Sequence, residues 1–362
     1  MSFAKKKQLN FLITTKCNLN CRYCYNNKID FKHQSLNYEF AKLGIDDFFR
    51  SDKSRSIKFF GVGEPTMDFD LMKKIWSYAY KKAGEKLRVE IQTNGCFPND
   101  VGKWLASHAD VIWLSWDGPP KIQNHYRPYR GGQKTSGLIE KNAAYLVKNG
   151  KGMTGARATI GKKNINKQKE MIEYFNSFGI KYIWAHPIFS AIGIKDEGDI
   201  DLKKYAKEFL KAYKFAKELG IFYGSIFTCN FDEKIIYNCR ACLPMPHLTT
   251  DGYVSACEMA SFGEDQGPMQ VFIYGKWDRE KNKIVYDKEK IKILRSRSAD
   301  NIKVCKGCAA LDHCAGYCPG EVVNETGDLF GRKTSVCEPI RYLAKHMPLN
   351  EGQYKYFHPC HI

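Results

Sequence analysis

Three cysteines lie close together near the start of the chain. Cys17, Cys21 and Cys24 have the spacing C-x3-C-x2-C within the stretch TTKCNLNCRYCYNN. A structural zinc site needs four ligands, usually from two C-x2-C pairs, and the nearest further candidate is His33. Three thiolates can instead hold three irons of a four-iron cluster, which leaves the fourth iron open to a ligand that is not protein. The spacing therefore favours a reactive iron-sulfur site.

The composition is that of a globular protein. The chain has 362 residues, of which 43% are hydrophobic and 14 are cysteines. No apolar run approaches the roughly 18 to 20 residues of a membrane span, and the N-terminal apolar segment is too short for a signal peptide. We therefore expect a cytoplasmic protein, whose cysteines serve metal or redox chemistry and not a disulfide framework.

The net charge of +18 is compatible with several kinds of partner. The lysines lie mostly on polar helix faces, as in the segment Asp201–Gly220, where they alternate with an apolar stripe; solvated helix faces therefore explain much of the charge. An acidic partner, such as a peptide with an acidic leader, is the second explanation. Nucleic acid is the least favoured partner.

The elements that must position the cysteines alternate along the first half of the chain. Short apolar runs predict strands, and amphipathic segments after them predict helices. Six such units in series predict an α/β fold with a parallel sheet, wound as an open sheet or as a partial barrel. The carboxyl ends of its strands should carry the chemistry. The expected strands are 8–15, 56–65, 87–95, 111–119, 155–160 and 181–189; the expected helices are 37–50, 68–84, 99–109, 136–150, 166–180 and 201–220.

Beyond Gly220 the pattern changes. The chain becomes irregular, cysteine-dense and interrupted by Gly and Pro. The stretch HLTTDGYVSACE predicts a small β-hairpin with its turn at Asp251-Gly252. The stretch EPIRYLAKHM predicts a final helix, which we expect to pack on the barrel.

The first cysteine motif resembles the signature of the radical S-adenosylmethionine (SAM) enzymes. The motif follows the first strand, and the aromatic Tyr23 precedes its last cysteine. In that family the amino and carboxylate groups of SAM chelate the open iron, and reductive cleavage gives a 5′-deoxyadenosyl radical that abstracts hydrogen from a substrate. The resemblance implies a partial (β/α)6 barrel, a four-iron cluster on Cys17, Cys21 and Cys24, Tyr23 at the cofactor site, and a flavodoxin- or ferredoxin-type electron donor.

A second motif, GVGEP, follows the second expected strand. It resembles the family segment that holds the methionine amino group, and the match rests on Gly63, Glu64 and Pro65 because Val62 replaces a glycine. Glycine lets backbone approach a ligand, and a carboxylate pairs with an ammonium group. The alternative is an ordinary turn between a strand and a helix.

The next strand ends supply further candidates for cofactor contacts. The resemblance assigns Asn94 to the cofactor site and matches Ser115 to a hydroxyl that contacts the ribose. Asp117 can equally be a cap at a helix entry. One of Arg127 and Arg130 is expected to meet the cofactor carboxylate, since guanidinium groups match carboxylates; the alternative is that both are surface residues.

Eight later cysteines resemble the SPASM extension, which holds two auxiliary four-iron clusters. The alternative is two zinc sites with the same ligands, because four thiolates also suit zinc. The pairing comes from the family and not from the order of the residues. It assigns one cluster to Cys239, Cys242, Cys257 and Cys318, and the other to Cys305, Cys308, Cys314 and Cys337.

Glu258 and three remaining cysteines complete the set of candidates. Glu258 stands where the anaerobic sulfatase maturases carry an aspartate base, and the alternative is a solvated hairpin residue. Cys360, near the C-terminus, is a candidate hydrogen-atom donor or part of a frayed tail. Cys96 and Cys229 are treated as small buried residues without an assigned role.

The favoured function is oxidative modification of a residue in a peptide or protein, as a crosslink, a thioether or an oxidised side chain. The alternatives are redox-neutral epimerisation with a cysteine as hydrogen donor, and a basic iron-sulfur or zinc protein that binds nucleic acid without catalysis. The expected domains are a barrel at 1–228, a SPASM domain at 229–345 and a tail at 346–362. Because the first strand starts near Gln8, we expect no N-terminal leader-binding domain.

Overall fold

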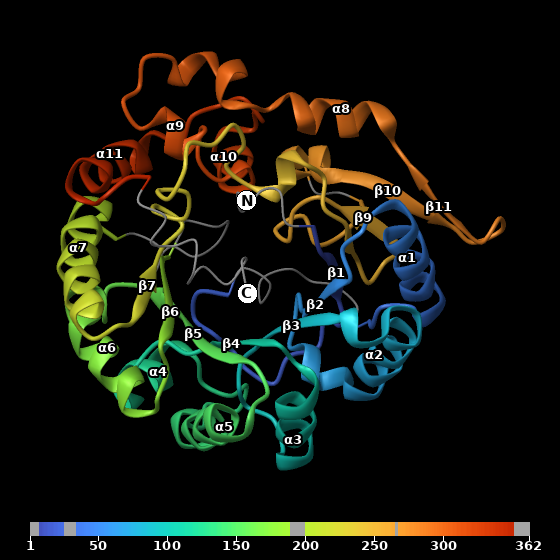
Figure 1. Ribbon diagram of the computed structural model, residues 1–362, viewed down its shortest axis with the longest axis horizontal. Coiled ribbons are helices and arrows are strands. Elements are labelled where there is room, and N and C mark those ends of the chain that lie inside the picture. The colour runs from blue at the N-terminus through green and yellow to red at the C-terminus, as the bar shows by residue number, and fades with distance from the viewer. Residues whose placement is uncertain (1–6, 25–33, 189–199, 265–266, 351–362) are drawn as a thin grey trace.

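The computed structural model describes residues 7–24, 34–188, 200–264 and 267–350. Its centre is one sheet of eleven strands in the order β11-β10-β9-β8-β1-β2-β3-β4-β5-β6-β7 (Figure 1). The strands are β1 Leu9–Leu12, β2 Ser56–Phe60, β3 Arg88–Thr93, β4 Val111–Ser115, β5 Met153–Ile160, β6 Tyr182–Pro187, β7 Phe222–Gly224, β8 His247–Leu248, β9 Tyr253–Ser255, β10 Ile273–Asp278 and β11 Lys283–Tyr286.

Helices cover the outside of the sheet and its C-terminal extension. Several helices begin with a side-chain cap. For example, the side chain of Asn37 accepts hydrogen bonds from backbone N–H groups in the first turn of α1. The helices are α1 Tyr38–Ser51, α2 Phe69–Ala83, α3 Asn99–His108, α4 Pro120–Tyr126, α5 Ser136–Asn149, α6 Gln168–Ser177, α7 Leu202–Glu218, α8 Lys288–Ser296, α9 Leu311–Cys314, α10 Pro319–Thr326 and α11 Cys337–His346.

The first seven strands form a curved, open parallel sheet. Each pairs in parallel with the next one along the chain, and the connecting helices lie on the convex side (Figure 1). All four residues of β1 are buried, as is usual for a parallel strand that is covered on both faces. The predicted α/β fold with a partial barrel is therefore confirmed. The structure adds β7, a parallel strand of only three residues that the sequence pattern did not reveal.

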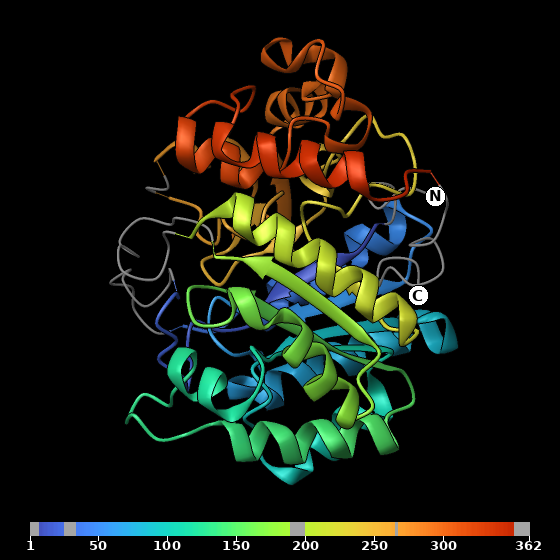
Figure 2. The same ribbon diagram turned by 90° about the vertical axis from the view of Figure 1, so that its left-hand side faces the viewer.

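The C-terminal part extends the same sheet. The predicted hairpin is present as β8 and β9, with Gly252 in its turn at φ 92°, a conformation that favours glycine. β8 also pairs in parallel with β1, and the hairpin of β10 and β11, which was not predicted, continues the sheet beyond β9. The final helix α11 packs against α7, as Figure 2 shows.

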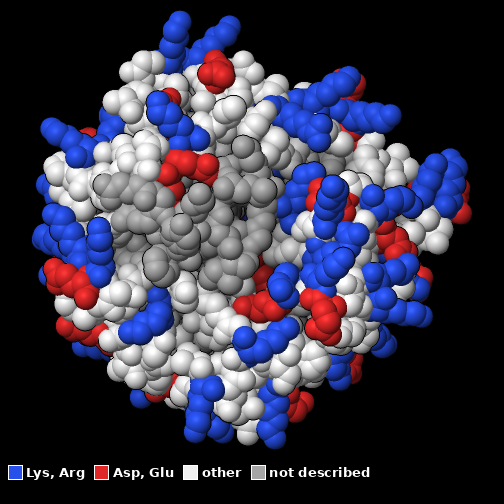
Figure 3. Space-filling model, in the orientation of Figure 1, with Lys and Arg blue, Asp and Glu red and all other residues white. Residues whose placement is uncertain are grey.

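Two properties bear on possible partners. In the part of the chain that is described, no helix combines the length and the apolar character needed to cross a membrane. On the face seen in Figure 3, the Lys and Arg side chains are distributed around the perimeter and are interspersed with Asp and Glu.

Gly63 fixes the chain beyond β2 against the segment that leads to the first cysteines. Its N–H donates to the carbonyl of Thr14 (2.9 Å), and the N–H of Glu64 donates to the carbonyl of Lys16 (2.7 Å). A Cβ atom on Gly63 would lie 2.0 Å from the Lys16 carbonyl oxygen, which is backbone and has no rotamer to change. Glycine is therefore required at this position for close packing of two chain segments.

We predict that Gly63→Ala lowers the free energy of unfolding by about 2 kcal/mol or more, because backbone must move to relieve the contact. Urea denaturation followed by circular dichroism measures the change. Gly137→Ala is the matched control, since nothing lies within 4 Å of an added Cβ there, and it should change stability by less than about 1 kcal/mol. Equal effects of the two substitutions would contradict the packing argument.

Candidate active site

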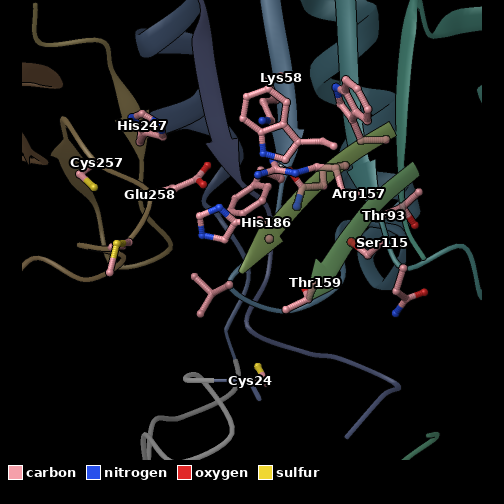
Figure 4. A pocket seen from close by; sticks show the side chains of 18 of the residues that line it. Cys24, Lys58, Thr93, Ser115, Arg157, Thr159, His186, His247, Cys257 and Glu258 are labelled. Atoms are coloured by element: carbon pink, nitrogen blue, oxygen red, sulfur yellow. Dashed lines mark hydrogen bonds between the residues drawn. The ribbon is translucent and has the colours of Figure 1, made fainter. Parts of the chain in front are cut away.

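A cavity of about 620 Å³ lies at the carboxyl ends of the parallel strands and extends to the C-terminal segment (Figure 4). Most candidates from the sequence line it. They are Cys17, Cys21, Tyr23, Cys24, Gly63, Glu64, Asn94, Ser115, Arg127, Arg130, Cys239, Cys257, Glu258 and Cys318. Pro65 does not line the cavity; it is buried as the first residue of a 3-10 turn, Pro65–Asp68.

The three-cysteine loop follows β1. The backbone turns at Cys21, whose carbonyl accepts from the N–H of Cys24 (3.0 Å), and the Sγ atom of Cys17 accepts from the N–H of Leu19 (3.4 Å). Burial raises the pKa of Cys17 to about 11 and raises that of Cys21 further. Buried thiols of this kind lose their protons when they bind a metal. Among the described residues, no three His, Cys, Asp or Glu side chains are arranged to hold a single metal ion.

The carboxylate of Glu64 ties the end of β2 to the end of β3. Its Oε1 atom accepts from the N–H of Thr66 (3.1 Å) and from the hydroxyls of Thr66 and Thr93 (both 2.7 Å), and Oε2 accepts from the N–H of Asn94 (2.6 Å). Burial raises the pKa of Glu64, although these hydrogen bonds oppose the shift. The carboxylate is thus fixed in place where it borders the cavity.

Asp117 binds three groups at the ends of neighbouring elements. Its Oδ2 atom accepts from the hydroxyl of Tyr23 (2.5 Å) and from Nε of Arg127 (2.9 Å), and Oδ1 accepts from the N–H of Thr159 (2.8 Å). The alternative that Asp117 caps a helix is wrong, because α4 is preceded by Pro119 and has no side-chain cap. Asp117 instead connects the cysteine loop to β5.

Arg127 is buried beside the cysteine loop and is not a surface residue. Its side chain lies over the ring of Tyr23 (5.1 Å to the centroid), and Nη1 is 4.0 Å from Sγ of Cys21. Burial acts to lower the pKa of Arg127, but Asp117, Tyr23 and Cys21 together outweigh burial and the pKa rises. The guanidinium therefore keeps its charge next to the thiols.

Arg130, Asn94 and Ser115 occupy the rest of this wall. The Nε atom of Arg130 donates to the carbonyl of Cys17 (2.7 Å), so this exposed side chain also braces the cysteine loop. The amide of Asn94 donates to Oδ1 of Asn18 (2.7 Å). Ser115 ends β4 and borders the cavity.

Glu258 enters the cavity from the opposite side. It follows the buried Cys257, and Figure 4 shows its carboxylate directed toward His186 and Arg157, which come from barrel strands. Glu258 is therefore not a solvated hairpin residue. It lies in the same cavity as the three-cysteine loop.

Basic side chains surround this carboxylate; Lys58, Arg157 and Arg240 are cations at neutral pH, and His247 is a neutral imidazole there. Burial acts to raise the pKa of Glu258, but Lys58, Arg157, His247 and Arg240 together outweigh burial and the pKa falls below its ordinary value of 4.5. Glu258 is consequently ionised at neutral pH and can accept a proton.

Sequence reasoning missed these cations, although a signal was present. Lys58 in the apolar strand SIKFF and Arg157 in GARATI are single charges inside buried strands, which need a partner or a function. Lys58 pairs with Glu90 (3.1 Å), and Nη1 of Arg157 donates to Oε1 of Gln92 (2.5 Å).

Two histidines in the cavity are neutral. Burial lowers the pKa of His186 to about 3 and that of His247 to about 4. The Nε2 atom of His186 lies 3.6 Å from the buried carboxylate of Glu321. The same carboxylate forms an ion pair with Lys333 (3.4 Å). These groups lead from the cavity into the C-terminal part of the chain.

The remaining cysteines lie in two groups. Four of them line a second cavity of about 220 Å³. In the other group, three border the large cavity, and the charge of Cys239 acts on the buried Cys242. The second cavity is lined by Cys305, Cys308, Cys314 and Cys337, and the large cavity by Cys239, Cys257 and Cys318.

Cys96 is buried as expected, but the expectation that Cys229 is buried is wrong, because Cys229 is partly exposed and borders the large cavity. Cys360 lies outside the described residues.

We predict that Asp117→Asn lowers the free energy of unfolding by about 3 kcal/mol, because it leaves the buried Arg127 without its counter-charge. Adding Arg127→Met should restore part of the loss, and a double-mutant cycle from urea denaturation measures the coupling. The surface pair of Lys203 and Glu338 is the control: Glu338→Gln should change stability by less than about 1 kcal/mol. Additive effects of the two buried substitutions would contradict the pairing.

Comparison with known proteins identifies the domain. Residues 11–175 match the family model of the radical SAM superfamily. An uncharacterised protein of Methanocaldococcus jannaschii is 32% identical over 180 residues, 49% of this chain and 61% of that protein, so the match spans less than two thirds of its length. The radical SAM cyclopropyl synthase TigE of Paramaledivibacter caminithermalis is 21% identical over 382 residues, 94% of this chain and 74% of that protein.

Solved structures share the fold across nearly the whole chain. The enzyme anSMEcpe with bound AdoMet superposes with a TM-score of 0.72 at 18% identity, over 94% of this chain and 96% of that one. SuiB of Streptococcus suis bound to S-adenosylmethionine gives 0.65 at 17% identity, over 91% and 76%. Both have also been solved with peptides, anSMEcpe with Cp18Cys and SuiB with its precursor peptide SuiA. The chain therefore carries a radical SAM domain within a fold shared with the SPASM-type radical SAM enzymes anSMEcpe and SuiB.

Proposed function

We propose that the protein is a radical SAM enzyme that oxidatively modifies a residue of a peptide or protein. One observation carries the proposal: a single cavity is bordered by the three-cysteine loop and Glu64 on one side, and by Glu258 with Cys257 and Cys318 on the other. A site for radical generation and a site for deprotonation thus face the same space.

The residues present fit the cofactors that the family implies. Cys17, Cys21 and Cys24 would hold a four-iron cluster, with Glu64 placed for the ammonium group of SAM and Arg127 near its carboxylate. Two further groups of four cysteines, one at each cavity, would hold the auxiliary clusters. When bound, these groups supply hydrogen abstraction from the substrate and an acceptor for the electron that oxidation releases.

The chain's own residues orient the substrate and take up its proton. Glu258 is ionised and is directed into the cavity, so it is the candidate base. Asp117 holds Arg127 and Tyr23 in fixed positions beside the cysteine loop. Arg157 also lines the cavity, and its Nη1 atom donates to the amide oxygen of Gln92. The other N–H groups of its guanidinium can donate to a carbonyl or carboxylate of the substrate.

The named relatives support a peptide as the substrate class. Two of the structural neighbours have been solved with peptides, anSMEcpe with Cp18Cys and SuiB with SuiA, and one relative in sequence is a cyclopropyl synthase. A cavity that accepts one side chain of an extended peptide would suit a substrate of this kind. A flavodoxin- or ferredoxin-type protein would provide the reducing electron. Mass spectrometry of candidate peptides co-expressed with the enzyme tests this proposal, and an oxidative modification predicts the loss of two hydrogens.

A second candidate function is redox-neutral epimerisation. It is supported by Cys229, whose thiol borders the cavity and can donate a hydrogen atom. It predicts a peptide of unchanged mass in light water that takes up one deuterium in heavy water. A protein that forms no 5′-deoxyadenosine with dithionite and SAM would instead favour a non-catalytic, basic iron-sulfur or zinc protein.

We predict that replacing Cys17, Cys21 and Cys24 together by alanine abolishes formation of 5′-deoxyadenosine and leaves about eight of about twelve irons per chain, since each cluster holds four. Chromatography of the nucleoside and iron analysis measure the two effects. Cys96→Ala is the control and should retain all the iron. Loss of every iron from the triple variant would show that the ligand groups are wrongly assigned.

We predict that Glu258→Gln slows product formation about 100-fold or more on a peptide that the wild-type enzyme modifies, because the amide cannot accept the proton. Cleavage of SAM should continue, so that product and 5′-deoxyadenosine become uncoupled. Glu264→Gln, at an exposed glutamate of the same segment, should leave both rates unchanged. Unchanged product formation in Glu258→Gln would exclude Glu258 as the base.

A further inference from the structure

Arg297 is a fully buried cation that no carboxylate in the described part of the chain pairs with. It follows α8 and has 0% of its surface exposed. Its guanidinium donates to three backbone carbonyls: from Nε to Leu329 (2.6 Å), from Nη2 to Gly316 (2.8 Å) and from Nη1 to Ala315 (3.4 Å). Each of the three nitrogens therefore has a hydrogen-bond acceptor, but these bonds do not neutralise the charge.

The carbonyls that Arg297 binds belong to an unusual turn. Ala315, Gly316 and Tyr317 all have positive φ (41°, 77° and 66°), a conformation that is unfavourable for residues other than glycine. Such a run persists only where surrounding contacts hold it. Arg297 provides two of these contacts from inside the protein.

The turn separates two cysteines that serve different cavities. Cys314 precedes it and lines the second cavity, whereas Cys318 follows it and lines the large cavity. Arg297 therefore lies at the junction between the two cysteine groups. The charge of Arg297 also acts on Cys242: burial raises the pKa of Cys242 to about 11, and Arg297 acts in the opposite direction.

The burial of this charge requires a negative partner. An isolated cation inside a protein is strongly unfavourable unless opposite charge is near, and the effect of charge is large where water is absent. The charge of Arg297 acts on Cys239 of one group and on Cys305 of the other. Thiolates that bind iron would supply the missing negative charge on both sides.

We propose that Arg297 is the counter-charge shared by the two auxiliary cysteine groups, and that it keeps the reduction potentials of the clusters they bind less negative. The inference rests on the proposed function, since it requires iron-sulfur clusters at both groups. A fixed positive charge favours the reduced cluster, which carries one more electron. Arg297 would thereby make the auxiliary clusters better acceptors for the electron released from the substrate.

The test is a redox titration of the reconstituted full-length protein, followed by electron paramagnetic resonance and independent of turnover. Arg297→Gln should decrease the ratio of reduced to oxidised auxiliary cluster at least tenfold at a fixed potential, equal to a 59 mV shift for one electron. Arg297→Lys retains the charge and should stay within threefold of wild type. Arg295→Gln removes an exposed charge two residues earlier, and it should cause no shift because solvent and salt screen it.

Iron and sulfide analysis separates the possible results. If Arg297→Gln loses its clusters, Arg297→Lys still decides the question, because a tenfold shift in that variant would show that geometry and not charge sets the potential. An unchanged potential in an iron-replete Arg297→Gln protein overturns the inference and leaves the proposed function intact. Zinc at both groups in the wild-type protein would overturn the auxiliary clusters and the inference together.

Discussion

A charge that is removed from water must be met by an opposite charge or by hydrogen bonds, and this constraint shapes the walls of the cavity. Asp117 forms an ion pair with Arg127, and Glu90 forms one with Lys58. The carboxylate of Glu64 accepts hydrogen bonds from hydroxyl and backbone N–H groups. Each of these arrangements joins neighbouring elements: Lys58 and Glu90 link β2 to β3, Glu64 links the chain after β2 to the end of β3, and Asp117 links the chain after β4 to the end of α4. The carboxyl edge of the sheet is therefore held rigid by the same side chains that give it its electrostatic character.

This rigidity matters for radical chemistry, in which a reactive intermediate must be kept from side reactions. Groups fixed by several partners keep their positions when a ligand arrives, and a water-poor cavity strengthens their interactions. Glu258 differs from Glu64 in this respect: among the described residues its charge is maintained by surrounding cations, whereas that of Glu64 is met by hydrogen bonds to its oxygens. A carboxylate held in this way is stable as an anion and remains open to a proton donor.

Much of the arrangement follows from the sequence, and the remainder depends on tertiary contacts. The amphipathic stripe of α7 was predictable because Tyr205, Phe209 and Ala216 recur at helical spacing, and all three are buried. β7 was not, since three residues show no periodicity. The gathering of strand-end residues follows from parallel topology, but the cations around Glu258 belong to segments far apart in sequence. The pairing of the later cysteines came from a family resemblance, because their order permits other groupings.

The parallel pairing of β1 with β8 has a consequence for biosynthesis. Asn10 lies opposite His247 and Phe11 opposite Leu248, so one edge of the first strand has to wait for a partner that is translated more than 200 residues later. During that interval the growing chain would present an unpaired, apolar strand edge, which is the kind of surface that chaperones cover and that aggregates form upon. The barrel half made alone, without the hairpin, would retain this edge permanently.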